Sequence, residues 1–313
     1  MGPSSPSSSV NYRLCPLYFF NYDGGQIDLP GGLQIIKIPR KFVEYLDRNY
    51  PDTLPTILSE ATWAIAIKNE QIDTTNMSVI ESMSIGLRQW DDARNQLFDL
   101  ITALRLYKKG RIVAGLQTLA KFHNSKWSIG GSTQWTSVSN ILFFKEEPTY
   151  NLKQSELQKL ITLFQQIRQY RASNILLNIK IALERFHSSY HNIIEDRIID
   201  QMIAFESLFI SADENKIKKK LSFRTAFLIR NRTDHRNIVV SNMKNSYKYR
   251  SNIVHDNNPP NRDTLREVVD YTGYYLRQSI LKFLSLLDKG YSIQQIRNKL
   301  KEDIHLNDQN ITY

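Results

Sequence analysis

Apolar residues in the C-terminal half recur at the spacing of amphipathic helices. Residues 149–258 contain neither glycine nor proline, so no helix breaker interrupts the pattern. Ile198, Met202, Phe205 and Phe209 follow one another at i, i+4, i+7 and i+11, which places them on one helix face. We predict an all-α bundle with helices at residues 155–171, 174–190, 194–210, 216–230, 236–255, 263–287 and 292–302.

The N-terminal half alternates short apolar or aromatic runs with turn residues. This spacing is typical of strands, which we predict at Tyr18–Tyr22, Leu33–Ile38, Trp63–Ile67, Met77–Ile85 and Val138–Phe144. Lys41–Arg48 and Asp91–Leu106 have helical spacing instead. The predicted fold class is α+β, with a flexible leader (1–12), a mixed α+β domain of sensing or regulatory role (13–150) and a helical bundle (151–313).

The charge of the chain is concentrated in one segment. The formal net charge is +10, and the stretch from Lys216 to His255 holds eleven lysines and arginines against the single acid Asp234, so the remainder sums to zero. A field confined to one segment indicates an anionic partner such as nucleic acid or an acidic protein. A solvated helix face is the alternative, which we favour for Lys218–Lys220 taken alone.

The sequence offers no signal for a cofactor, a metal or a membrane span. Cys15 is the only cysteine, which excludes an intramolecular disulfide and fits a reducing, cytoplasmic setting. Every apolar run falls short of the ~20 residues that span a bilayer. His187 and His191 have a spacing that can bind metal, but without a further ligand set we interpret them as surface histidines.

Three charged residues, Glu206, Arg224 and Arg250, occupy helix stripes that are otherwise apolar. A charge buried in a bundle without a partner is strongly unfavourable, so each must pair, reach solvent or line a cleft. The economical solution is a structural ion pair between Glu206 and Arg224. Arg250 is then left over and faces a cleft or a second subunit.

Arg250 and His255 lie at the end of a predicted basic helix. One is a permanent cation and the other exchanges protons near neutral pH, a combination suited to cleaving a phosphodiester without a metal. On a regular α-helix the two positions differ by about 140° in direction and by about 7.5 Å along the axis. The spacing alone is a weak signal, because similar pairs occur at Arg230/His235 and Arg185/His191.

Several segments between residues 175 and 287 resemble a known family. They are Ala182–Phe186 with Tyr190, Glu195–Asp200, Ala204–Phe209, Ser222–Ala226 and Tyr249–His255. Their order and spacing resemble the HEPN domain (higher eukaryotes and prokaryotes nucleotide-binding), in particular the ApeA-like branch of bacterial antiphage proteins. The resemblance implies that the helical bundle is a HEPN domain.

The resemblance also implies a metal-independent endoribonuclease in which two chains join their Arg and His side chains in one composite site. Carried over, Arg250 stabilises charge on the scissile phosphate, and His255 transfers a proton at the attacking 2′-hydroxyl or the leaving 5′-oxygen. The implied products are a 2′,3′-cyclic phosphate and a 5′-hydroxyl. Asp256 stands where the family often has glycine. Its carboxylate would orient the imidazole or raise its proton affinity, so the role of His255 as the base stays open.

Four neighbours of the pair are candidate substrate ligands. Ser251 and Asn252 occupy the variable positions of the motif and can hydrogen-bond phosphate, with a plain surface role as the alternative. Lys248 adds a charge and Tyr249 a stacking face. The expected partners are RNA, a second copy of the chain, and an antitoxin or phage-derived trigger, as for a toxin or defence protein. The alternative function is a non-catalytic HEPN module that binds RNA or protein, or that only dimerises.

Overall fold

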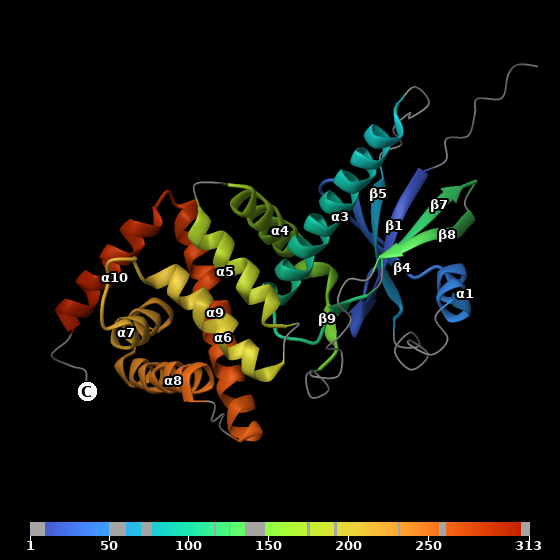
Figure 1. Cartoon of the computed structure of the whole chain (residues 1–313). Helices are drawn as coiled ribbons and strands as arrows, with labels where there is room; N and C mark the ends of the chain where they lie inside the picture. The colour runs from blue at the N-terminus through green and yellow to red at the C-terminus, as the bar shows by residue number, and fades with distance from the viewer. Residues whose placement is uncertain are drawn as a thin grey trace, which may run out of the picture. The chain divides into compact units, whose positions relative to one another are not determined.

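The protein divides into two compact units, residues 1–168 and 169–313. The computed structural model describes residues 10–49, 61–69, 77–115, 117–124, 126–134, 148–173, 176–190, 193–230, 232–256 and 261–307. The first unit is built on an antiparallel sheet and the second is helical, so the predicted α+β class, with a mixed part before an all-α bundle, is confirmed (Figure 1). The predicted boundary at residue 150 precedes helix α4 (Leu157–Ala172), whereas the division by contacts falls within that helix.

The main sheet of the first unit has the strand order β3-β4-β5-β1-β7-β8, with β6 also paired to β1. Its neighbouring strands pair antiparallel throughout. The strands are β1 (Val10–Tyr18), β3 (Ile27–Leu29), β4 (Leu33–Lys37), β5 (Trp63–Asn69), β6 (Val113–Ala114), β7 (Gln117–His123) and β8 (Lys126–Gln134). Two short strands, β2 (Phe20–Tyr22) and β9 (Tyr150–Leu152), form a separate parallel pair.

Helices cover both faces of this sheet around the central strand β1. On one face Leu14 packs in a cluster with Phe42 of helix α1 (Arg40–Asn49). Successive side chains of a strand point to opposite faces, so Arg13 points the other way. There its guanidinium carbon lies 3.6 Å from the centroid of the Trp90 ring of helix α3 (Val79–Tyr107). Burial on both faces explains why the apolar run in β1 shows no polar alternation.

The strand predicted at Met77–Ile85 is wrong, because α3 begins there. Ser78 and Glu81 form a capping box: the Glu81 backbone nitrogen donates to Ser78 Oγ at 3.3 Å, and the Ser78 backbone nitrogen donates to Glu81 Oε2 at 2.8 Å. These reciprocal bonds satisfy donors that a helix start leaves unpaired, and they outweigh the strand-like alternation of the apolar residues.

Of the other elements predicted in the N-terminal half, some are confirmed and others differ from the structure. The strands at 33–38 and 63–67 and the helices at 41–48 and 91–106 are confirmed, whereas Tyr18–Tyr22 is split at Phe19, which has a φ of 58°. Strand β1 begins at Val10, inside the segment 1–12 that was predicted as a flexible leader. Strands β7 and β8 were not predicted, and Val138–Phe144 lies outside the described residues.

The Ser78 cap leads to a first prediction. We expect Ser78→Ala to destabilise the first turns of α3 by about 1 kcal/mol, because it leaves orphan backbone donors. Ser84→Ala is the matched control, since the same change inside the helix removes no cap and favours helix slightly. Amide hydrogen exchange at residues 79–83 measures both. Equal exchange in the two variants would contradict a capping role.

The second unit consists of helices that pack around one apolar core (Figure 1). Each predicted helical segment is confirmed, and the last one extends to Asn307 rather than 302. The four stripe residues from Ile198 to Phe209 are each 0% exposed. The helices here are α5 (Leu177–Ser188), α6 (Ile194–Phe209), α7 (Ile217–Ile229), α8 (Thr233–Ser251), α9 (Arg262–Asp288) and α10 (Ile293–Asn307). Within the described part of the chain, no helix has both the length and the apolar character needed to cross a membrane.

Candidate functional site

Arg250 lies in the last turn of α8, half-buried. Its Nε is buried and has no hydrogen-bond partner among the described residues. Arg250 acts electrostatically on Glu206, near the end of α6: burial raises the pKa of the Glu206 carboxyl, and the attraction of Arg250 partly offsets this rise. A buried donor without an acceptor is costly, so an anion that reached this N–H would accept its hydrogen bond favourably.

The chain leaves α8 through a π-helical turn, η3 (Asn252–Asp256). This turn carries His255, whose side chain is exposed. A π-turn closes with i→i+5 hydrogen bonds, so it holds one more residue than an α-turn and each residue advances by a smaller angle. The offset between positions 250 and 255 is therefore smaller than the about 140° of a regular α-helix. The π-turn therefore places Arg250 and His255 closer to one face than a regular α-helix would.

Contacts with α9 fix the rotation of α8. Ser246 Oγ and Thr272 Oγ1 are 2.7 Å apart, and Asn242 Nδ2 donates to the Tyr275 hydroxyl at 2.9 Å. Asn242, Ser246 and Arg250 follow one another at intervals of four residues and so lie on one face of α8. The hydrogen bonds of the first two therefore also constrain the direction in which Arg250 projects. Asn242 and Ser246 are functional positions that the apolar stripes do not indicate, although polar residues at i, i+4 on a helix that must bury a face are a signal.

The predicted substrate ligands surround Arg250 unevenly. Ser251, Asn252 and Tyr249 are half-buried, whereas Lys248 is exposed. Burial raises the pKa of Tyr271 to about 12. A hydrogen bond with Ser246 opposes this rise, and Tyr249 and other groups add to it. The use of Tyr249 as a stacking platform for a base stays a prediction.

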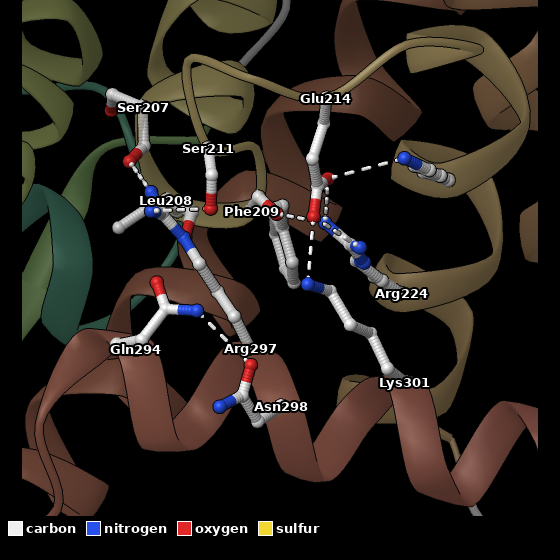
Figure 2. A network of polar contacts seen from close by, with 11 residues as sticks. Ser207, Leu208, Phe209, Ser211, Glu214, Arg224, Gln294, Arg297, Asn298 and Lys301 are labelled. Atoms are coloured by element: carbon white, nitrogen blue, oxygen red, sulfur yellow. Dashed lines mark hydrogen bonds and ion pairs between the residues drawn. The ribbon is translucent and has the colours of Figure 1, made fainter.

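The predicted ion pair between Glu206 and Arg224 is wrong. Arg224 is 2% exposed and binds Glu214 with both terminal nitrogens, at 2.6 Å through Nη1 and 2.9 Å through Nη2 (Figure 2). Its Nη1 also donates to the carbonyl of Phe209 at 2.5 Å. Glu214 lies in the loop between α6 and α7, where helical periodicity carries no information. Among the arginines, it is Arg250 and not Arg224 that attracts Glu206, and this attraction is smaller than the effect of burial.

A second arginine, Arg297 of α10, completes the same buried network. It donates to the carbonyls of Ser207 at 2.7 Å and of Leu208 at 2.8 Å (Figure 2). The last carbonyls of a helix have no intrahelical partner, and here Arg224 and Arg297 supply donors for those of α6. Burial lowers the pKa of Arg297, which the charge of Glu214 counteracts. The network is structural: it anchors the C-terminal end of α6, the helix that carries Glu206.

The other Arg/His pairs differ from Arg250/His255 in their surroundings. Arg185 binds Asp200 of α6 at 2.9 Å, and His191 lies outside the described residues. Arg230 contacts the Tyr274 hydroxyl at 3.2 Å, and His235 lies 3.8 Å from the carboxylate of Asp234. In the part of the chain that is described, no group of three or more His, Cys, Asp or Glu side chains is placed to hold a metal ion.

Comparison of the chain with protein-family models, with curated proteins and with solved structures finds no match.

Proposed function

We propose that this chain is a metal-independent endoribonuclease of the HEPN type, which acts in the cytoplasm as a homodimer. The observation that carries the proposal is the end of α8: Arg250 has a buried Nε with no hydrogen-bond partner in the described part of the chain, and an exposed imidazole follows on a widened helical turn. In addition, the segments that resemble HEPN domains lie on the consecutive helices α5 to α8 of a single unit, and two of them are joined by the Arg185–Asp200 ion pair.

The proposed chemistry divides between the two side chains. The 2′-oxygen attacks phosphorus as its proton passes to an imidazole, the bond from phosphorus to the 5′-oxygen breaks, and that oxygen takes up a proton. The guanidinium of Arg250 balances the negative charge that builds on the non-bridging oxygens. Two chains would provide two copies of His255, so that one accepts a proton while the other donates one. A role in antiphage defence or as a toxin, held in check by an antitoxin or released by a phage-derived trigger, fits such an activity.

The test is cleavage of a single-stranded RNA in excess chelator, with analysis of the ends. We expect cutting to continue, with 2′,3′-cyclic phosphate and 5′-hydroxyl ends, and a single 2′-deoxy substitution to block it at that linkage. Cutting that stops with chelator, or products with 3′-hydroxyl ends, would contradict the chemistry. The matched control is the same oligonucleotide made entirely of DNA.

One observation favours a second candidate, a HEPN module that binds RNA without turnover. The stretch from Lys216 to His255 carries all the net charge of the chain, which suits retention of a polyanion whether or not it is cut. Tight, salt-sensitive RNA binding with no product after long incubation would favour this function over the nuclease.

A further inference from the structure

A pocket of about 590 Å³ lies in the second unit, between the loop after α6, the start of α7 and the end of α10. Five cationic side chains, Lys216, Lys219, Lys220, Arg224 and Lys301, line it against two carboxylates, Asp213 and Glu214, so the lining has a net charge of +3 with His305 neutral. The volume is in the range of small-ligand sites, which run from about 300 to 1,000 Å³. Its charge selects an anion.

The cations of the pocket differ in how they are engaged. Lys301 lies 2.9 Å and Lys220 3.8 Å from the Glu214 carboxylate, which also binds Arg224, so these three neutralise a buried acid. Lys216 and Lys219 are exposed, and the Lys219 ammonium also lies 5.7 Å from the centroid of the Phe223 ring. Lys216 precedes α7 in a left-handed conformation with a φ of 53° and makes no side-chain cap, so the first-turn N–H groups of α7 lack that acceptor. The exposed lysines and the helix start offer donors to the same kind of ligand.

The pocket lies at the same end of the α7–α8 pair as Arg250. The two helices run antiparallel, since Arg236 stacks on the Phe227 ring at 4.0 Å while Lys244 lies 5.7 Å from the ring of Phe223, further back along α7. Measured along the helix axes from the contact of Lys244 with Phe223, Lys219 lies one turn (about 6 Å) nearer the start of α7. Arg250 lies about 9 Å nearer the end of α8. Both therefore extend toward one end of the helix pair.

We propose that this pocket binds phosphate groups of the RNA strand that continues from the linkage held at Arg250. The inference rests on the proposed function, because it takes RNA as the polyanion. Lysine ammonium groups act as point charges toward phosphate and read no sequence, so the pocket would position the strand without selecting bases. The pocket would then contribute to binding of long RNA, and not to chemistry at a single linkage.

The experiment compares salt dependence of RNA binding in two variants built on His255→Ala, which keeps the RNA intact. In Lys216→Gln/Lys219→Gln, the slope of log K against log salt for a single strand of about 20 nucleotides should fall by about 1.4, because each neutralised phosphate of a single strand contributes about 0.7. Lys282→Gln/Lys289→Gln, which removes two exposed lysines of the α9 region outside the pocket lining, should leave the slope unchanged. An unchanged slope in the pocket variant, or an equal fall in both, would overturn the inference.

Two further measurements separate this inference from the proposed function. With His255 present, the pocket variant should cleave a dinucleoside monophosphate, which has one phosphate, as fast as the unmodified chain. If the unmodified chain cleaves no RNA but the slopes differ as expected, the nuclease fails and the phosphate pocket stands. Inorganic pyrophosphate tests a free ligand. If it binds and the pocket variant loses this binding while the RNA slope stays constant, the pocket serves a small phosphorylated compound and the RNA assignment is overturned.

Discussion

Replacement of Arg250 or His255 by alanine is expected to abolish measurable RNA cleavage. Loss of a guanidinium that stabilises a phosphoryl transition state costs about 10²–10³-fold in rate, and loss of a positioned proton-transfer group about 10²–10⁴-fold. Arg250→Lys should recover little, because one ammonium cannot reproduce the planar fork of donors. The measurement is single-turnover cleavage of a labelled RNA at saturating protein, which separates chemistry from binding.

The chain supplies its own matched control at the other end of α8. Arg230 and His235 are also five residues apart, but they flank the connection between α7 and α8 and contact Tyr274 and Asp234. The variant Arg230→Ala/His235→Ala removes the same chemical groups from the same basic segment. It should therefore cleave within a few-fold of the unmodified chain. If it loses as much activity as the variants at the end of α8, the assignment to Arg250 and His255 fails.

Mixing the two inactive variants tests whether the site is shared between chains. A mixed dimer retains one Arg250 and one His255, so a composite site predicts partial recovery of cleavage after subunit exchange. Recovery would be absent if each chain cut RNA with its own pair. Folding is checked by thermal unfolding of each variant, since Arg250→Ala removes the charge that faces Glu206. Glu206→Gln in that background relieves the uncompensated carboxylate, and its stability should match or exceed that of Arg250→Ala alone.

Local patterns predicted the helical unit well and the sheet unit unevenly. The segment from residue 149 to 258 has no glycine or proline, and its stripes lie on one side of each helix, so periodicity and packing agree. In the sheet unit, β1 is buried on both faces, and β7 is built from Gln117–His123, for which the sequence analysis gives no prediction. Met77–Ile85 shows how a short apolar run that suits a strand becomes helix when it contains a capping box.

The candidate site could be predicted as a set of residue types but not as an arrangement. Periodicity identified Glu206, Arg224 and Arg250 as charges on apolar stripes, and it then paired the wrong two. The true partner of Arg224 lies in a loop, whose path depends on tertiary packing. The π-turn is equally invisible, because a single added residue in a helical turn leaves no mark on composition, yet it changes the direction in which His255 projects.

The Arg224–Glu214 pair is expected to be among the most stabilising polar contacts of the second unit. The Glu214 side chain is 6% exposed, and removal of one partner from a buried ion pair costs about 3–5 kcal/mol because the other charge is left uncompensated. Arg224→Met, which keeps the length of the side chain, should lower the free energy of unfolding by about that amount. In a double-mutant cycle Arg224 should couple to Glu214, whereas its cycle with Glu206 should be additive within about 0.5 kcal/mol.

The two glutamates should respond to pH with opposite signs. Burial opposes ionisation of Glu214, but hydrogen bonds from Arg224 and Lys301 outweigh it and lower its pKa from 4.5 to about 2. Its contribution to stability is therefore complete above the unfolded pKa and is lost as pH falls from 4.5 toward 2. The pKa of Glu206 is raised, so its ionised form is the less favourable one in the folded chain, and stability is gained as pH falls through that pKa. Glu214→Gln should thus lower the free energy of unfolding at neutral pH and weaken its dependence on pH below 4.5. Glu206→Gln should leave the free energy of unfolding at neutral pH unchanged or raise it. Denaturant unfolding across this pH range measures both. Equal losses at neutral pH would show that Glu206 carries a compensated ion pair, contrary to the geometry.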